Sequence, residues 1–327
     1  MDKPKVVITR RIPDEALEIV RKHAEAYLWD SEEQPIPREV LLQEIRDAAG
    51  ILANVSDRID KAIFEGAPRL RVVSTMAVGY DNIDTAEATN RKIPVGHTPG
   101  VLTETTADLT FALLMATARR IVEAADFLRD GKWKSWAPML LTGPDVYGAT
   151  IGIIGMGRIG EAVAKRAAGF GMKILYHNRT RRHEIEERLN AQYRSLENLL
   201  RESDFVVLLA PSTPETYRMM GRKEFDMMKP SAIFINTSRG QNVDERALYE
   251  ALKDNKIWAA GIDVFEHEPA PPDHPLLSLP NITALPHIGS ASIATRTAMA
   301  VLAAKNLAAG LAGEKLLFCA NPIVYND

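Results

Sequence analysis

Short apolar runs alternate with amphipathic segments along most of the chain. An apolar run of roughly 4–8 residues bounded by turn residues is typical of a buried strand, and apolar residues three or four positions apart indicate a helix. The predicted strands span residues 6–9, 50–54, 70–74, 94–96, 150–154, 173–176, 205–210, 232–236, 259–263 and 282–284. The predicted helices span residues 13–23, 40–45, 61–66, 85–91, 161–169, 221–228, 245–253 and 293–311. This alternation predicts parallel sheets with helices on both faces.

A glycine-rich turn opens the second half of this series. The apolar run from Thr150 leads into Gly155-Met156-Gly157-Arg158-Ile159-Gly160, and an Ala-rich segment follows. In this pattern the first glycine permits a tight turn, the second lets backbone approach a pyrophosphate, and the third lets the helix pack close to the strand. A glycine turn without a ligand is an equally common reading of an isolated match. Here the next apolar run completes a βαβ unit, so the segment predicts a dinucleotide site.

Residues 102–126 break the alternation. They are rich in Ala and Leu, are apolar on several sides, and predict one long buried helix, followed by a loop-like stretch over 131–148. The fold expected is α/β, with two doubly wound parallel-sheet domains, a Rossmann-type cofactor domain being inserted in a flavodoxin-like substrate domain. We expect residues 1–100 to begin the substrate-binding domain, 101–288 to form the NAD(P)-binding domain, and 289–327 to return to the first.

Composition and charge narrow the function classes. The 327 residues are enough for two domains, and 46% hydrophobic with 25% charged residues is an ordinary globular balance. A net charge of −3 gives no electrostatic footprint for nucleic acid. The single cysteine, Cys319, excludes an internal disulfide framework and a Cys-based zinc site, so no metal is expected. Without a signal-peptide pattern or a membrane-spanning apolar stretch, the expectation is a soluble cytoplasmic protein.

Three segments that follow predicted strands carry candidate chemistry. Arg239 lies just past one strand, where ligands bind in open α/β sheets, and its guanidinium can clamp a carboxylate. Residues 263–268 hold three carboxylates and a histidine, and His287 follows the last strand. Each group alone is more often structural: a surface Arg, a solvated acidic loop or a packed His. Together they can hold an anion, move a proton and tune the His, which suits reduction of a 2-oxo acid by a nicotinamide.

Over its whole length the chain resembles the D-isomer-specific 2-hydroxyacid dehydrogenases, and within them the glyoxylate/hydroxypyruvate reductases. The motifs that carry the resemblance occur in one order at 78–84, 98–102, 155–160, 170–172, 236–240, 261–264 and 287–291. The resemblance implies an oxidoreductase that reduces small 2-oxo acids to D-2-hydroxy acids with NAD(P)H. Formate dehydrogenases have Gln at the position of Glu268, and phosphite dehydrogenases have Lys at that of Val78, which argues against both branches.

The resemblance also implies roles for individual residues. Arg239 would bind the substrate carboxylate and 2-oxo oxygen, and His287 would be the general acid in reduction and the base in oxidation. Glu268 would pair with His287 and favour its imidazolium form. The backbone amides of Val78 and Gly79 would hold the substrate carboxylate from the first domain.

For the cofactor, Asp263 would bind the nicotinamide carboxamide and Thr106 would contact the cofactor from the long helix. Residues 211–213 would border the adenine. The cofactor-binding set implied is Thr106, Gly155, Gly157, Arg158, Ile159, Gly160, Asn178, Arg179, Thr180, Pro211, Thr213, Asp263, His287 and Gly289.

One position departs from the NAD-type pattern of this family. The ribose-binding acid is expected at the end of the second strand, about 20 residues beyond the glycines. In this chain the aligned position, 18 residues after Gly160, is Asn178, and Arg179-Thr180-Arg181-Arg182 follow. A solvated basic turn is the structural alternative. The hypothesis is a site for a 2′-phosphate, with NADP preferred and NAD possible.

The resemblance further implies a C₂ homodimer, in which the helix from Leu102 and the arm from Trp133 to Gly148 form the interface and Trp136 reaches the partner's active site. Two alternatives stay open for the function. One is a D-2-hydroxyacid dehydrogenase of broader specificity. The other is a cofactor-sensing binding protein like the corepressors that share this fold, because such relatives keep the Arg/Glu/His set.

Overall fold

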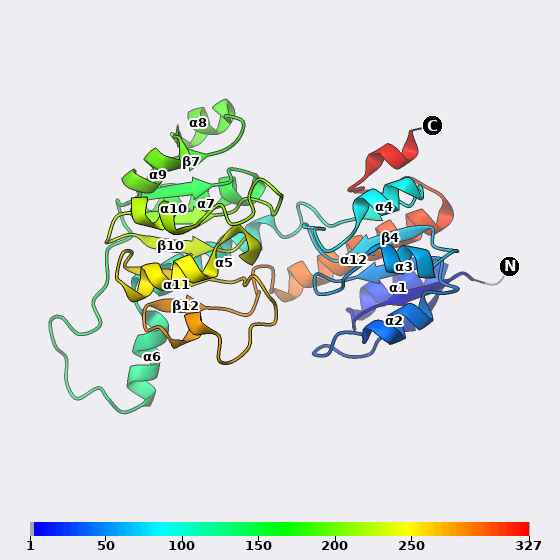
Figure 1. The fold of residues 1–327 in the computed structure, drawn as a ribbon, viewed down its shortest axis with the longest axis horizontal. Coiled ribbons are helices and arrows are strands. Elements are labelled where there is room, and N and C mark those ends of the chain that lie inside the picture. Colours follow the sequence, from blue (N-terminus) through cyan, green and yellow to red (C-terminus); the bar gives the residue numbers. More distant parts are fainter. Residues whose placement is uncertain (1–2, 327) are drawn as a thin grey trace. The chain divides into compact units, whose positions relative to one another are not determined.

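A computed structural model describes residues 3–326. The chain divides into two compact units: unit 1 comprises the described parts of Met1–Leu102 and Ala291–Asp327, and unit 2 is Thr103–Ser290. Each unit is a parallel sheet covered by helices on both faces (Figure 1), which confirms the predicted fold class. No helix among the described residues is long and apolar enough to cross a bilayer.

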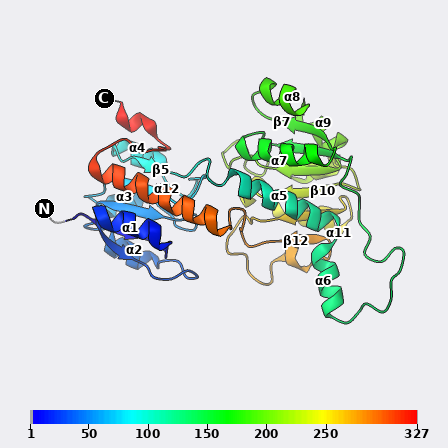
Figure 2. The ribbon, with the colours of Figure 1, turned by 180° about the vertical axis from the view of Figure 1, so that it is seen from behind.

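Unit 1 contains a five-stranded sheet in the order β2-β1-β3-β4-β5. Its strands are β1 Lys5–Ile8, β2 Glu25–Leu28, β3 Gly50–Ala53, β4 Val72–Thr75 and β5 Val95–Gly96. Its helices are α1 Asp14–His23, α2 Arg38–Glu44, α3 Lys61–Gly66, α4 Thr85–Asn90, α12 Ile293–Ala312 and the 3₁₀ turn η3 Pro322–Tyr325. One face packs on α2, α3 and α4, and the other on α1 and α12, which Figure 2 shows from behind.

Unit 2 contains a seven-stranded sheet in the order β12-β11-β10-β9-β6-β7-β8. Its strands are β6 Thr150–Ile154, β7 Lys173–His177, β8 Gln192–Tyr193, β9 Phe205–Leu208, β10 Ile233–Asn236, β11 Ala259–Ile262 and β12 Ile282–Ala284. Its helices are α5 Thr103–Ala118, α6 Ile121–Arg129, α7 Arg158–Gly169, α8 His183–Leu189, α9 Leu196–Glu202, α10 Arg222–Met227, α11 Glu245–Lys253, with 3₁₀ turns η1 Gly240–Asn242 and η2 Pro275–Ser278. Helices α5 and α7 cover one face, and α9, α10 and α11 cover the other.

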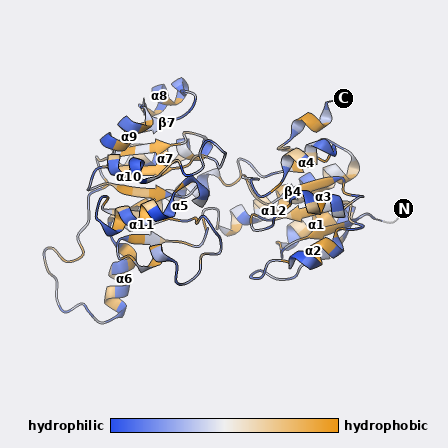
Figure 3. Cartoon of the chain, in the orientation of Figure 1, coloured by the Kyte–Doolittle hydropathy of each residue, from blue (hydrophilic) through white to orange (hydrophobic). Residues whose placement is uncertain are grey.

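The strand sequences explain why the sheet lies at the centre of unit 2. Strands β9 and β10 are buried along their whole length, as expected for apolar parallel strands covered on both faces. In Figure 3 the strands are mostly hydrophobic, whereas α9 and α11 include hydrophilic residues. Asp244 caps α11 by accepting hydrogen bonds from the amides of Arg246 and Ala247, which fixes where that helix begins after β10.

The single long helix predicted over 102–126 is wrong. The chain forms α5 and α6 instead, and the break falls at Arg120, whose φ of 51° is left-handed. The Arg120 guanidinium makes two hydrogen bonds to Glu123, at 2.8 and 2.7 Å, and so stabilises the start of the second helix. The prediction of burial holds for α5, but none of the α6 residues is buried.

Four short elements have no counterpart among the predicted ones: β2, α8, β8 and α9. Strand β2 lies at the edge of its sheet, and none of its four residues is fully buried. Strand β8 has only two residues, and α8 is mostly charged with one buried residue, Ile185. Helix α9 does bury Leu199 and Leu200, but its seven residues, like the other three elements, are too few for a clear periodic pattern.

Candidate active site

Three neighbouring strands of unit 2 end next to one another, and each is followed by a candidate residue. Strands β10, β11 and β12 are adjacent and parallel, with Ile235 in register with Gly261 and Gly261 in register with Thr283. Their carboxyl ends therefore lie at one edge of the sheet. Arg239 follows β10, Asp263 and Glu268 follow β11, and His287 follows β12.

His287 and Glu268 form a close polar pair. The Nδ1 atom of His287 lies 2.6 Å from Oε2 of Glu268, and both side chains are about one-third exposed, at 30% and 34%. The other carboxylate oxygen, Oε1, accepts a hydrogen bond from the amide of Phe265 at 3.0 Å. Because Nδ1 is engaged by the carboxylate, Nε2 is the ring nitrogen that remains for a substrate.

The surroundings of Glu268 favour the ionised form of its carboxyl. Burial alone would raise its pKa, but the hydrogen bond and positive charge of His287, the amide of Phe265 and the charge of Arg239 outweigh burial, so the pKa of Glu268 lies below its ordinary value. The pair therefore combines a carboxylate with an imidazole at hydrogen-bond distance. This is the arrangement that a general acid requires.

The backbone of His287 is held in an unusual conformation. Its φ is 55°, in the left-handed region that non-glycine residues seldom adopt. Asp263 stabilises this conformation from the end of β11. Its carbonyl accepts a hydrogen bond from His287 N at 2.9 Å, and its Oδ1 accepts one from Ile288 N at 2.8 Å. Burial raises the pKa of Asp263 despite the amides of Ile288 and Gly289 and the charge of His287.

Arg239 is partly buried in the turn that leads into η1. Asn236, the last residue of β10, shapes this turn: its Nδ2 donates to Arg239 O at 3.1 Å and its Oδ1 accepts from Ser238 Oγ at 2.8 Å. The positive charge of Arg239 contributes to the lowered pKa of Glu268, so the guanidinium and the carboxylate act on each other electrostatically. A cation beside the His–Glu pair can hold an anionic substrate next to a proton donor.

The glycine turn has the geometry that a dinucleotide site requires. Gly155 has a φ of 103°, and a Cβ there would lie 2.7 Å from the backbone of Ala210. A Cβ on Gly160 would lie 2.4 Å from Gly155 O, whereas one on Gly157 would meet nothing within 4 Å. The turn thus packs tightly at its ends and is open in the middle, above the start of α7. Arg158 and Ile159 form the first turn of that helix.

Asn178 closes this turn, a role that the sequence did not predict. Its Oδ1 accepts a hydrogen bond from Met156 N at 2.7 Å, which ties the end of β7 to the glycine turn. Only the proximity of two loops in the fold reveals such a contact, because 22 residues separate the partners.

Arg179 and Arg181, two of the basic residues that follow Asn178, have different surroundings. Arg181 donates to both carboxylate oxygens of Glu186, at 2.7 and 2.8 Å, and so is engaged within the protein. Arg179 is exposed and lies near the 211–216 loop: Thr213 lowers the pKa of Glu215, and the charge of Arg179 adds to that effect. The adjoining Thr180 is also exposed.

The remaining predicted cofactor residues of unit 2 fall into two groups. A Cβ on Gly289 would lie 3.2 Å from Asp263 Oδ2 and 3.5 Å from Thr106 Cγ2, so these three residues are neighbours. Pro211 and Thr213 follow the end of β9. In unit 1, Val78 and Gly79 follow the carboxyl end of β4, and Val78 O lies 3.0 Å from His97 Nδ1.

Comparison with known proteins identifies the family. Residues 111–289 match the family model described as D-isomer specific 2-hydroxyacid dehydrogenase, NAD binding domain. The chain belongs to this family. The predicted resemblance is therefore confirmed, as is the expectation of an NAD(P)-dependent dehydrogenase.

The chain is similar over nearly its whole length to several known proteins and solved structures. A glyoxylate reductase of Korarchaeum cryptofilum is 54% identical over 95% of this chain and 94% of its own. The TT0316 protein of Thermus thermophilus has a structure with a TM-score of 0.90 at 46% identity, covering 97% and 99% of the two chains. An NADPH-dependent glyoxylate/hydroxypyruvate reductase from Sinorhizobium meliloti, solved with NADP and malonate, has a TM-score of 0.87 at 34% identity, covering 98% and 97%.

The polar cluster that fixes the turn after β7 gives a testable pH dependence. Arg181 and the hydroxyl of Tyr176 lower the pKa of Glu186 from 4.5 to about 2. Because the folded-state pKa is depressed, Glu186 stabilises the fold above pH 4.5, and this contribution is lost as the pH falls from 4.5 towards 2. Glu186→Gln should therefore melt at a lower temperature than wild type at pH 7, with the difference narrowing below pH 4.5 in calorimetry. A difference independent of pH would contradict this account.

Proposed function

We propose that this protein reduces glyoxylate and related small 2-oxo acids to D-2-hydroxy acids, with NADPH as the preferred reductant. The observation that carries the proposal is the 2.6 Å pair between His287 Nδ1 and Glu268 Oε2, with Arg239 acting on the same carboxylate. The relatives named glyoxylate reductase, at 54% identity and below, support this choice of substrate.

In this proposal each group has one task. A bound nicotinamide supplies the hydride. Arg239 binds the substrate carboxylate and polarises the 2-oxo oxygen. His287 donates the proton on Nε2 to the oxygen that becomes the hydroxyl, while Glu268 stabilises the imidazolium from the Nδ1 side. In oxidation the same imidazole accepts the proton.

The cofactor is held by the open glycine turn at the start of α7 and by the residues around it. The pyrophosphate would lie against Gly157, Arg158 and Ile159, where a Cβ on Gly157 would meet no atom within 4 Å. Asp263, Gly289 and Thr106 surround the nicotinamide in the proposal, and Pro211 and Thr213 border the adenine. Asn178, Arg179 and Thr180 take the ribose and its 2′-phosphate.

The reductase activity can be tested directly. The purified protein should oxidise NADPH when glyoxylate or hydroxypyruvate is added, with glycolate or D-glycerate as product. Activity on a panel of larger 2-oxo acids at similar kcat/KM would favour the alternative of a broader dehydrogenase. If the protein binds the cofactor but turns over none of these acids, the proposal fails and a cofactor-sensing role becomes the better explanation.

Variants separate the three roles in the same assay. His287→Ala should lower kcat by roughly 10²–10⁴-fold, the usual effect of removing a positioned acid. Arg239→Ala should raise KM strongly because it removes a charge-assisted clamp. Glu268→Gln should move the pH–rate profile to lower pH, since the imidazolium loses its partner. Wild-type activity in His287→Ala would refute its assignment as the acid.

Cofactor choice should depend on Arg179 more than on Arg181. A hydrogen bond to a charged group contributes about 1.5–3 kcal/mol, so one Arg179 contact to a 2′-phosphate favours NADPH over NADH by about tenfold to a hundredfold. Arg179→Ala should lower the NADPH/NADH ratio of kcat/KM by that factor. It should raise the NADPH/NADH ratio of dissociation constants, measured by calorimetry, by the same factor. Arg181→Ala is the matched control, because Arg181 is already engaged by Glu186. An unchanged ratio in Arg179→Ala would exclude the phosphate site.

The proposed assembly is a homodimer built on the helical stretch from Leu102, which forms α5 and α6, and on the arm over Trp133–Gly148. The arm extends away from the sheet of unit 2 in Figure 1, and Trp136, Met139 and Tyr147 are 78%, 77% and 80% exposed. A cavity of about 700 Å³ beside α6 is lined by Val122, Phe127 and Trp258, among others. Apolar side chains this exposed on one segment are typical of an interface.

Light scattering at micromolar concentration should give twice the mass of one chain. Trp136→Arg places a charge in the proposed interface and should shift the mass towards that of the monomer. Leu277→Arg changes another exposed apolar residue of unit 2, outside the arm, and should leave the mass unchanged. A monomeric wild type would rule out the dimer.

A further inference from the structure

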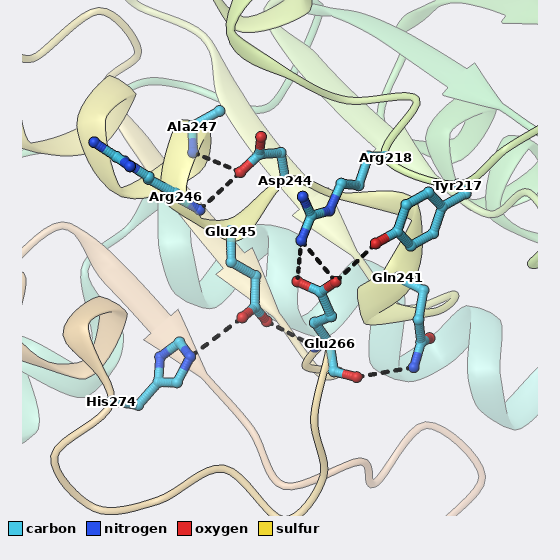
Figure 4. A network of polar contacts seen from close by, with 9 residues as sticks. All are labelled: Tyr217, Arg218, Gln241, Asp244, Glu245, Arg246, Ala247, Glu266 and His274. Atoms are coloured by element: carbon cyan, nitrogen blue, oxygen red, sulfur yellow. Dashed lines mark hydrogen bonds and ion pairs between the residues drawn. The ribbon is translucent and has the colours of Figure 1, made fainter.

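The segment that carries Glu268 has no regular secondary structure and is held by polar side chains. Figure 4 shows this network around Glu266, two residues before Glu268. The amide of Glu266 donates to Glu245 Oε1 at 2.7 Å, and its carbonyl accepts from Gln241 Nε2 at 2.9 Å. Its carboxylate accepts from Arg218 Nη2 at 3.0 and 3.2 Å. Three different parts of unit 2 therefore fix this one residue.

Within this network, the Glu245 side chain is oriented by a second partner, His274. It is the first residue of α11, and its second oxygen, Oε2, lies 3.2 Å from His274 Nε2. Both side chains are only 16% exposed. The His274 ring also packs edge-on against Phe265, with 5.2 Å between ring centroids. The Glu245–His274 pair thus contacts two consecutive residues of the segment, Phe265 and Glu266.

The peptide between Phe265 and Glu266 is also packed against the turn that carries Arg239. A Cβ on Gly240 would lie 1.9 Å from the carbonyl carbon of Phe265 and 2.2 Å from Glu266 N, so only glycine fits. The amide of Phe265 itself donates a hydrogen bond to Glu268 Oε1. A displacement of this peptide would therefore be transmitted to the Glu268 carboxylate and to its contact with His287.

We infer that Glu245, oriented by His274, is a positioning residue for the His287–Glu268 pair. It acts through the amide of Glu266, which without Glu245 would lose its hydrogen-bond acceptor. The segment would then hold Glu268 less firmly against the imidazole. The inference rests on the proposed role of His287 and Glu268 in proton transfer. The other charged groups of unit 2 that act on this pair are Asp263 and Arg239.

The test is the pH dependence of reduction by Glu245→Ala. Its kcat should fall roughly tenfold, within the 10²-fold that a ~1 Å misplacement can cause, while the KM for glyoxylate changes little. The alkaline limb of the profile should move to lower pH, in the direction expected for Glu268→Gln, because the imidazolium is less well paired. Glu245→Gln keeps an oxygen acceptor for the Glu266 amide and should retain most of the activity.

Glu250→Ala is the matched control, since it removes a carboxylate of the same helix that pairs with Arg246 and Arg222 at the surface. It should leave both kcat and the profile unchanged. If Glu245→Ala does not fold, His274→Ala should give a smaller shift in the same direction, because the bond to Glu266 remains.

A Glu245→Ala enzyme with the wild-type rate and profile overturns the inference. So does one that loses rate only in proportion to its folded fraction, measured by circular dichroism, with an unmoved profile. Failure of the proposed function would look different, because the wild-type protein itself would then turn over no 2-oxo acid. Failure of the roles proposed for His287 and Glu268 would leave His287→Ala and Glu268→Gln with wild-type activity.

Discussion

Asp263 ties together the strand ends on which the candidate site is built. Its amide donates to Asn236 O at the end of β10, its carbonyl accepts from His287 N, and its carboxylate accepts from Ile288 N. One buried residue at the end of β11 therefore connects the segments that carry Arg239 and His287. A left-handed backbone at a non-glycine residue costs of order 1–3 kcal/mol, and these hydrogen bonds are what offset that cost at His287.

The two carboxyl groups of the site differ in environment, and their pKa shifts have opposite directions. Asp263 is 1% exposed and bonded mainly to backbone amides, and burial raises its pKa. Glu268 also suffers from burial, but a facing imidazole and the charge of Arg239 reverse the effect and lower its pKa. Glu268 is thus the carboxyl best suited to act as a counter-charge for an imidazolium, while Asp263 suits a structural and cofactor-facing role.

Much of the fold was predictable because continuous apolar runs in the sequence mark its buried strands. The strands β3, β10 and β11 are buried along their whole length. The helices 61–66 and 245–253 were predicted with the bounds that the structure has. The break at Arg120 was not predictable by periodicity, since α5 and α6 are both rich in apolar residues and the left-handed residue between them leaves no pattern. The edge elements β2 and β8 were missed because they bury little surface.

The candidate site was only partly predictable from the sequence. Residues that follow strand ends, such as Arg239 and His287, could be found because parallel strands bring their carboxyl ends to one edge. The contacts that orient them could not, because they join residues far apart in sequence: Asn178 with Met156, and Glu245 with Glu266.

Strand ends and loops are held in place by different means in this fold. The backbone of a strand end is fixed by its ladder, so β10 and β12 determine where Arg239 and His287 emerge. The segment that carries Glu268 has no ladder, and each of its polar backbone groups needs a partner from elsewhere if it is to be buried. Gln241 and Glu245 meet that need at Glu266, and Glu268 itself meets it at Phe265. The Gln241 and Glu245 side chains thereby fix the backbone of the segment from which the Glu268 side chain extends to His287.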